Sequence, residues 1–198
     1  MVTVIGITGP TGAGKTTLLR EVEKLGGAVI DCDAVYHEML ERDASLQFAL
    51  EAAFGPLRDA SGGIDCKKLG TVVFGDPEKL KQLNTVVQGA VSDRARRLIE
   101  AYGEQGRGLA AVDAISLIES PLMELCKPTV AVLAPPQVRV ERIMAREGIV
   151  EDYAWSRVRA QKPDRYFIQH CDHTLINDCS SAEEFSQKAR DFLKEVLS

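Results

Sequence analysis

A glycine-rich stretch near the start of the chain constrains its fold more than any other feature. Residues 9–16 read GPTGAGKT and follow directly on the apolar run Val2–Thr8. The spacing matches GxxxxGK[ST], in which backbone N–H groups turn inward around phosphate oxygens and the following helix presents its positive end to the same charge. The stretch therefore predicts a strand, a phosphate-binding loop and a helix, with Lys15 reaching the β- and γ-phosphates of a nucleotide and the Thr16 hydroxyl binding Mg²⁺.

Length, charge and cysteine content limit what surrounds this loop. A chain of 198 residues with 45% hydrophobic residues can bury one core. Its net charge of −5 gives no reason to expect a nucleic-acid or membrane partner. The five cysteines lack CxxC spacing, which favours free thiols in a reducing compartment over disulfides or a zinc site. With no signal-peptide pattern at the amino terminus, the sequence predicts a cytoplasmic protein.

Five short apolar runs bounded by turn residues predict strands that are buried on both faces, as in a parallel sheet. They are Val2–Thr8, Ala28–Asp31, Gly108–Ala114, Thr129–Ala134 and Thr174–Ile176. Helical patterns lie between them, at Thr16–Leu25, Pro136–Arg146 and Ser181–Leu197. This alternation indicates an α/β fold with a doubly wound, mostly parallel five-stranded sheet. We expect the second strand to lie beside the first.

The stretch from Val35 to Gln105 interrupts the alternation. It is mostly helix-like, at Glu38–Phe54 and Glu78–Tyr102, with a turn-rich middle around residues 55–63. A connection of this length is either a subdomain of its own or a functional insertion.

Several classes of protein use a phosphate-binding loop, and the rest of the chain favours a small kinase. The NKxD motif of GTPases is absent, and the apolar run ending at Asp113 lacks the adjacent Glu of motor ATPases. Arg139, Arg142 and Arg146 are spaced to share one helix face. A solvated face explains any one of them, but as a cluster they are typical of a lid that neutralises charge during phosphoryl transfer.

Segments along nearly the whole chain resemble the dephospho-coenzyme A kinase family, which transfers the ATP γ-phosphate to the ribose 3′-hydroxyl of dephospho-coenzyme A. Residues 29–33 are similar to the family's V-I-D-A-D element, and residues 116–119 resemble the end of its P-L-L-F-E motif. Residues 157–161 are similar to its R-I-x-x-Q lid element, and residues 171–177 to the A-D-Y-V-I-x-N strand that precedes an adenine-contacting loop. Departures from the family pattern are Gln88-Gly89 in place of His-Pro, Ile115 in place of Pro and His173 in place of Tyr.

The resemblance implies a P-loop kinase fold in one domain spanning residues 1–198. Its core would comprise residues 1–34, 106–138 and 166–198, its acceptor-binding helical insertion residues 35–105 and its lid residues 139–165. ATP and Mg²⁺ are the implied cofactors and dephospho-coenzyme A the implied acceptor, in a monomer or weak homo-oligomer. A related kinase with another acceptor and a nucleotide-binding regulatory protein are the alternatives.

The resemblance also implies roles for single residues. Asp33 would be the base that handles the 3′-hydroxyl proton, since ligands in open α/β sheets bind outside the carboxyl ends of the strands. A helix N-cap is the alternative for Asp33, and Asp31 is expected to be structural. Arg142 and Arg146 would clamp phosphates when the lid closes, with Lys15, Arg142 and Asp33 as the catalytic residues. The expected ATP contacts are Gly9, Gly12, Ala13, Gly14, Lys15, Thr16, Thr17, Arg146 and Asn177, and the expected acceptor contacts are Asp33, Gln88, Glu119, Arg157 and Gln161. Asp113 and Glu119 either help to organise Mg²⁺-bound water or the acceptor, or are buried, paired carboxylates.

Overall fold

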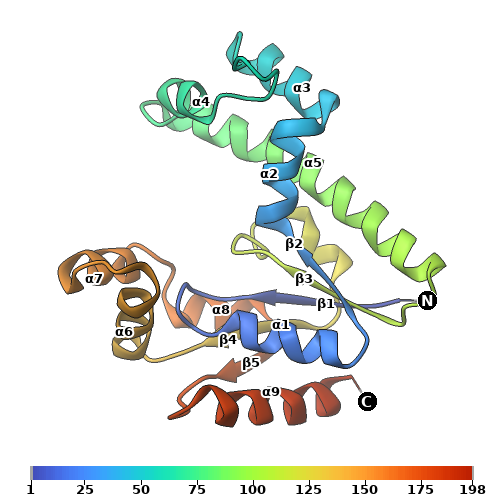
Figure 1. Cartoon of the computed structure of the whole chain (residues 1–198), viewed down its shortest axis with the longest axis vertical. Coiled ribbons are helices and arrows are strands. Elements are labelled where there is room, and N and C mark those ends of the chain that lie inside the picture. Colours follow the sequence, from blue (N-terminus) through green and yellow to red (C-terminus); the bar gives the residue numbers. More distant parts are fainter. Residues whose placement is uncertain (1, 198) are drawn as a thin grey trace. The chain divides into compact units, whose positions relative to one another are not determined.

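The computed structural model describes residues 2–197, which divide into two compact units (Figure 1). We call residues 2–30 and 99–197 the sheet unit and residues 31–98 the helical unit.

The sheet unit is built on five strands. They are β1 (Thr3–Thr8), β2 (Ala28–Asp31), β3 (Leu109–Asp113), β4 (Thr129–Leu133) and β5 (His173–Ile176), in the spatial order β2-β3-β1-β4-β5. β1 pairs in parallel with both β3 and β4, and β4 pairs in parallel with β5. The predicted five-stranded, mostly parallel sheet is confirmed, and every predicted strand boundary lies within one residue of the observed one.

The prediction that β2 lies beside β1 is wrong, because β3 lies between them. Strands that follow one another in the chain are spatial neighbours only about two-thirds of the time. Here both edges of β1 are occupied, by β3 and by β4, and its side chains Ile5 and Ile7 are fully buried. The carboxyl end of β3, which carries Asp113, is therefore next to the loop that follows β1.

Helices cover both faces of the sheet. On one face, α1 (Lys15–Lys24) and α9 (Ala182–Val196) pack against each other and against the inward side chains of β1 and β4 (Figure 1). On the other, Phe167 of α8 (Asp164–His170) packs against Ala131 and Leu133. The short 3-10 helix η1 (Pro121–Leu125) leads into β4. This two-sided cover explains why the strands read as continuous apolar runs.

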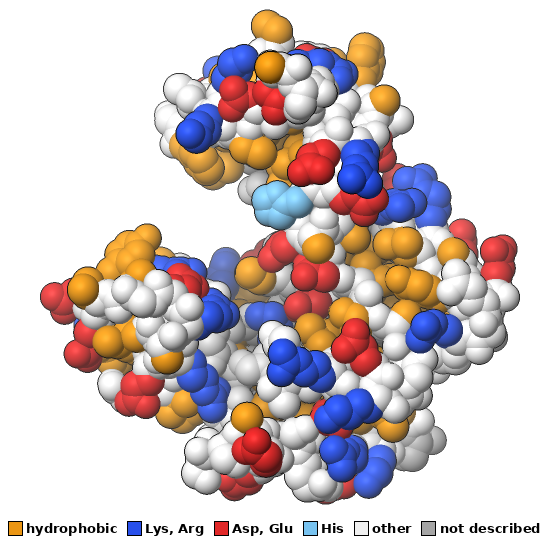
Figure 2. Space-filling view, viewed as in Figure 1, with side chains coloured by type: hydrophobic (Ala, Val, Ile, Leu, Met, Phe, Trp, Pro, Cys, Tyr) orange, Lys and Arg blue, Asp and Glu red, His pale blue; other side chains and the backbone are white. Residues whose placement is uncertain are grey.

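Residues 139–165, predicted as a lid and called the lid below, follow β4. They comprise most of α6 (Pro136–Glu147) and all of α7 (Glu151–Arg159), which pack around a small core of their own made by Val140, Ile143, Ala154 and Val158. Hydrophobic side chains also lie on the surface of the lid, on the left of Figure 2. Val150, one of its residues, is 71% exposed.

The helical unit contains α2 (Cys32–Arg42), α3 (Ala44–Phe54), α4 (Cys66–Val73) and most of α5 (Pro77–Glu104). The prediction of one helix over Glu38–Phe54 is wrong, because α2 ends and α3 begins at Asp43. The Asp43 carboxylate accepts hydrogen bonds from the backbone N–H groups of Ser45 at 2.9 Å and Leu46 at 3.0 Å. An aspartate at this position satisfies the free donors at a helix start, and so it favours a new helix over continuation of the old one.

Candidate active site

The phosphate-binding loop occupies the turn between β1 and α1, where its spacing predicted it. Gly9, Gly12 and Gly14 have φ angles of 137°, 82° and 107°, which side chains rarely allow. A Cβ atom would also lie 2.1 Å from the Val132 carbonyl oxygen at Gly9 and 2.9 Å from the Arg139 carbonyl oxygen at Gly12. At Gly14 it would lie 2.3 Å from Asn177 Nδ2. The glycines are therefore required by the neighbours behind the loop as well as by its backbone conformation.

Lys15 lies at the start of α1 and turns back over the loop. Its Nζ donates a hydrogen bond to the Gly9 carbonyl oxygen at 2.9 Å. Thr16 is exposed on the first turn of the same helix. The ammonium and the hydroxyl therefore both lie at the positive end of α1, where anionic oxygens bind most favourably.

Arg142 and Asn177 connect the lid to the loop. The Arg142 guanidinium donates to the carbonyl oxygens of Gly12 at 3.3 Å and Ala13 at 3.4 Å, and to Asn177 Oδ1 at 3.1 Å. Asn177, only 3% exposed, donates from Nδ2 to the Ala13 carbonyl oxygen at 2.9 Å. The structure therefore brings together two residues that are 35 positions apart in the sequence and were both expected at the nucleotide.

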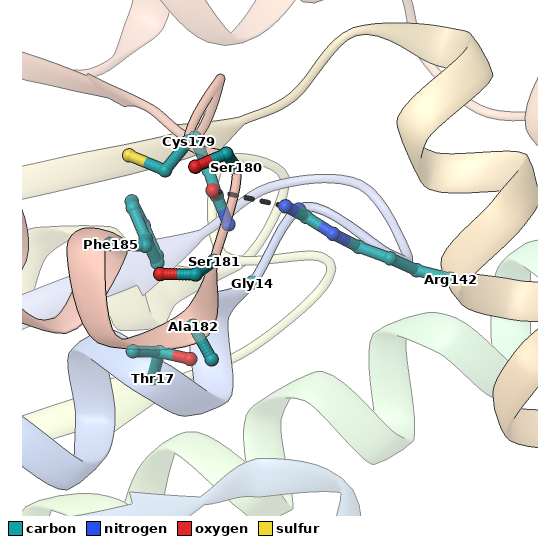
Figure 3. Close-up of a pocket in the computed structure, with 9 residues that line it drawn as sticks. Gly14, Thr17, Arg142, Cys179, Ser180, Ser181, Ala182 and Phe185 are labelled. Carbon is teal, nitrogen blue, oxygen red and sulfur yellow. Dashed lines mark hydrogen bonds between the residues drawn. The ribbon is translucent and has the colours of Figure 1, made fainter.

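A pocket of about 250 Å³ opens beside this network (Figure 3). Arg142 reaches it from α6. Across from it lie Cys179, Ser180 and Ser181, which precede α9, and Ala182, the first residue of α9. It is lined by Gly14, Thr17, Arg142, Asn177, Cys179, Ser180, Ser181, Ala182 and Phe185. Burial and the nearby Glu184 carboxylate raise the pKa of the Cys179 thiol, which keeps this part of the lining uncharged. The lining thus combines apolar and neutral polar side chains with one cation, the Arg142 guanidinium.

The residues after Asn177 were not individually predicted as part of the site. Only their position in the sequence could have indicated them, because they lie between the strand that resembles a family element and the last amphipathic helix. Phe185 had no such signal, because an aromatic residue on an amphipathic helix reads first as core.

The remaining lid residues have other partners. Arg146 donates to Glu147 Oε1 at 2.6 Å, and Arg157 also donates to the Glu147 carboxylate. Both hydrogen bonds lower the pKa of Glu147, and the one from Arg146 has the larger effect. Arg139 is buried and bonded to Thr11 and Gln161 rather than sharing the environment of Arg142. The three arginines predicted on one helix face thus lie in three different environments.

Glu119 lies close to residues of the segment that leads into α8. Lys162 Nζ is 3.7 Å from Glu119 Oε1 and 4.8 Å from the centre of the Tyr166 ring. Burial and a hydrogen bond with Glu119 raise the pKa of Tyr166 to about 12. Glu119 is thus paired but exposed, so the alternative of a buried, paired carboxylate is met only in the pairing, and its acceptor role stays a prediction.

Two predicted acceptor residues belong to the helical unit. Asp33 is exposed on the first turn of α2, and Gln88 is half-buried on α5. Asp31, not Asp33, caps α2, since its carboxylate accepts from the backbone N–H groups of Asp33 and Ala34, each at 3.0 Å. The N-cap alternative for Asp33 is therefore wrong, and the structural role expected of Asp31 is confirmed.

Comparisons with known proteins agree with this geometry. A family model described as dephospho-CoA kinase matches residues 3–183. A Bacillus cereus protein named dephospho-CoA kinase is 33% identical over 179 residues, which are 90% of each chain. A Thermus thermophilus crystal structure is 30% identical, with a TM-score of 0.78 over 100% of this chain and 98% of its own. A Campylobacter jejuni dephospho-CoA kinase structure, 21% identical, has a TM-score of 0.61 over 98% and 97% of the two chains and supports the P-loop kinase fold.

Within residues 2–197, none of the helices combines the length and the apolar character needed to cross a membrane. The family model spans the phosphate loop and the segments predicted as the insertion, residues 35–105, and the lid, residues 139–165. The chain belongs to the dephospho-CoA kinase family.

Proposed function

We propose that this chain transfers the γ-phosphoryl group of ATP to the ribose 3′-hydroxyl of dephospho-coenzyme A, giving coenzyme A and ADP. Beyond family membership, the observation that carries the proposal is the pocket of about 250 Å³ beside the end of the phosphate loop. Pockets for whole drug-sized ligands measure about 300–1,000 Å³, so this one suits a single moiety of a larger molecule. Adenine is that moiety in our proposal, with its phosphate chain running into the loop.

The nucleotide contacts follow from this placement. Ser180, Ser181 and Asn177 offer polar groups for the edge of a base, and Phe185 and Ala182 offer apolar surface. The planar guanidinium of Arg142 can stack on a base or bind phosphate oxygens, because it has both a flat face and a fork of donors. Gly9 and Gly12 to Thr17 cradle the phosphates.

Lys15 and Arg142 supply the positive charge that phosphoryl transfer requires. The transferred group spreads negative charge over its oxygens, and fixed cations at those oxygens stabilise the transition state. The Thr16 hydroxyl, exposed at the start of α1, is the hard oxygen ligand that would hold Mg²⁺, which would supply positive charge at the phosphates. Among residues 2–197, no group of three His, Cys, Asp or Glu side chains is placed to hold a metal ion.

Asp33 is the proposed base for the acceptor hydroxyl. Gln88, Glu119 and Arg157 are proposed acceptor contacts. Glu119 and Arg157 would exchange their present partners, Lys162 and Glu147, for the substrate. Arg146 would likewise leave Glu147 to reach ATP when the lid closes.

An acceptor panel tests the proposal. ADP release is measured with dephospho-coenzyme A, adenosine, several nucleoside monophosphates and shikimate, and the product is analysed by ³¹P NMR to locate the new phosphate. We expect dephospho-coenzyme A to be the best acceptor, with phosphate on the 3′-oxygen. Lys15→Ala should abolish release in every arm, which controls for contaminating kinases.

Equal or faster turnover with a nucleoside monophosphate would overturn the proposed acceptor and favour a related kinase. Nucleotide binding without ADP release in any arm would favour the regulatory alternative.

A further inference from the structure

Thr11, in the middle of the phosphate loop, is held through both of its oxygen atoms. Its carbonyl oxygen accepts a hydrogen bond from Arg139 Nε at 3.0 Å. Its hydroxyl oxygen accepts one from Gln161 Nε2 at 2.8 Å. Arg139 in turn donates from its Nη2 atom to Gln161 Oε1. The three residues form a closed ring of hydrogen bonds in which each residue is bonded to both of the others, Thr11 through its hydroxyl to Gln161 and through its backbone carbonyl to Arg139.

Arg139 occupies an unusual environment for a surface-helix arginine. It is 3% exposed, so its charge has been removed from water. Burial lowers the pKa of the guanidinium, and the nearby charge of Asp164 opposes this shift. A buried charge is weak evidence for stability, because hydrophobic residues of similar size often stabilise as well, but it specifies geometry. Arg139 uses that geometry to bind the phosphate loop.

The two residues that hold Thr11 come from the two ends of the lid. Arg139 lies in α6, just after the chain leaves β4, and Gln161 follows the end of α7. Between them α6 and α7 form the lid's own small core. Thr11 is therefore held from both ends of the lid.

Both ends of the Gln161 amide are engaged in this arrangement. Its oxygen accepts from Arg139 and its nitrogen donates to Thr11, which also fixes which way the amide points. Turning the amide away to contact an acceptor would break the ring.

We propose that Gln161 and Arg139 are positioning residues, which set the shape of the phosphate loop by holding Thr11 between the two ends of the lid. The proposal rests on the proposed function for the reaction that the loop serves. It replaces an acceptor-binding role for Gln161 with one that acts on the nucleotide through Thr11.

Two substitutions test this ring. Gln161→Leu removes both amide bonds at similar size, and Thr11→Val removes only the hydroxyl while keeping a β-branched side chain. Misplacing a binding group by about 1 Å can cost about 10²-fold in rate. We expect each variant to weaken ADP binding, measured by calorimetry, and to lower kcat/KM for ATP by about 10- to 100-fold. The KM for dephospho-coenzyme A should stay within about twofold of wild type.

Three matched controls separate positioning from general damage. Gln137→Leu makes the same change at an exposed glutamine of α6, whose amide contacts only Glu141 among the hydrogen bonds described here, and should leave all parameters unchanged. Thr11→Ser keeps the hydroxyl and should restore ADP affinity. The double variant Thr11→Val with Gln161→Leu should be no weaker than Gln161→Leu alone, because both remove the same bond. Thermal melting checks folding, and if Gln161→Leu fails to fold, Thr11→Val carries the test.

A raised KM for dephospho-coenzyme A with unchanged ADP affinity would overturn the proposal and return Gln161 to the acceptor. Behaviour equal to that of Gln137→Leu, or a Thr11→Ser variant as impaired as Thr11→Val, would overturn it too. ADP affinity is measured without any acceptor. A wild-type protein that fails to phosphorylate dephospho-coenzyme A would therefore contradict the proposed function and leave this test intact.

Discussion

Asp31 and Asp33 are two positions apart and have different surroundings. The Asp31 carboxylate is occupied by two backbone N–H groups at the start of α2. The Asp33 side chain is exposed on the first turn of the same helix. Because the capping role belongs to Asp31, a substitution at Asp33 tests chemistry without removing the cap.

Asp33→Asn should lower kcat by on the order of 10² to 10⁴, the usual range for loss of a general base, with little change in ATP affinity. Asparagine is nearly the same size as aspartate but cannot take a proton. Asp31→Asn is the matched control and should retain kcat and melting temperature, since Asn caps a helix about as well as Asp. Steady-state kinetics and thermal melts of both variants make the comparison.

Activity of Asp33→Asn within a few fold of wild type would contradict its role as the base. The next candidate would be Asp113, because its strand position pairs with Ile7 of β1, two residues before the phosphate loop.

The arginines of α6 show how far residue spacing predicts a site. A period of three and four residues correctly places Arg139, Arg142 and Arg146 along one side of a helix. It cannot say which turn of that helix meets the loop, because this depends on where α6 leaves β4. In the structure the first arginine is buried, the second binds loop carbonyls and the third pairs with a neighbouring glutamate.

At the scale of the element, α1 is fastened to α9 by a buried carboxylate. Glu21 is 1% exposed and pairs with Lys24 at 2.6 Å and Arg190 at 3.0 Å, and it also accepts a hydrogen bond from Ser186. Burial raises the pKa of Glu21, but these three partners outweigh it and lower the pKa to about 2. The helix that begins at the phosphate loop is thereby tied to the helix that follows the proposed adenine pocket.

Glu21→Gln should lower the free energy of unfolding by about 1–3 kcal/mol at neutral pH, the range for hydrogen bonds to charged groups. The pKa of Glu21 is lower in the folded protein than its ordinary value of 4.5, so its contribution is fully present above pH 4.5. It is lost as pH falls from 4.5 toward 2. The difference between wild type and variant, measured by denaturant unfolding across this range, should shrink accordingly. A difference that stays constant with pH would show that the charge of Glu21 does not contribute.

Strands were predictable from this sequence and several helices were not, for physical reasons. A strand covered on both faces is mostly apolar, and β1 and β4, which are buried over most of their length, show this. The break at Asp43 depends on one side chain that can end one helix and start another. The short helices α4, α7 and α8 have too few residues for a clear period. The order of the strands could not be predicted from local sequence patterns, because nothing in the residues of β2 or β3 indicates which of them pairs with β1.

At the scale of the whole molecule, ATP consumption should depend on the acceptor. Transfer requires an oxygen held in line with the γ-phosphate, and water has none of the other groups by which an acceptor is held. ADP release without dephospho-coenzyme A should therefore be slower by on the order of 10² or more. A coupled assay with and without acceptor measures this, with Lys15→Ala as the background. Release at similar rates in both conditions would mean that the chain acts as an ATPase.

The three glycines of the phosphate loop are backed by three different parts of the sheet unit, namely β4, α6 and Asn177. Fixing the backbone of one residue costs roughly 1–2 kcal/mol in conformational entropy. Because these neighbours pack against the loop backbone, the loop loses that entropy when the chain folds, before a nucleotide binds. The loop is therefore preorganised, and little of the binding free energy of ATP has to be spent on ordering it.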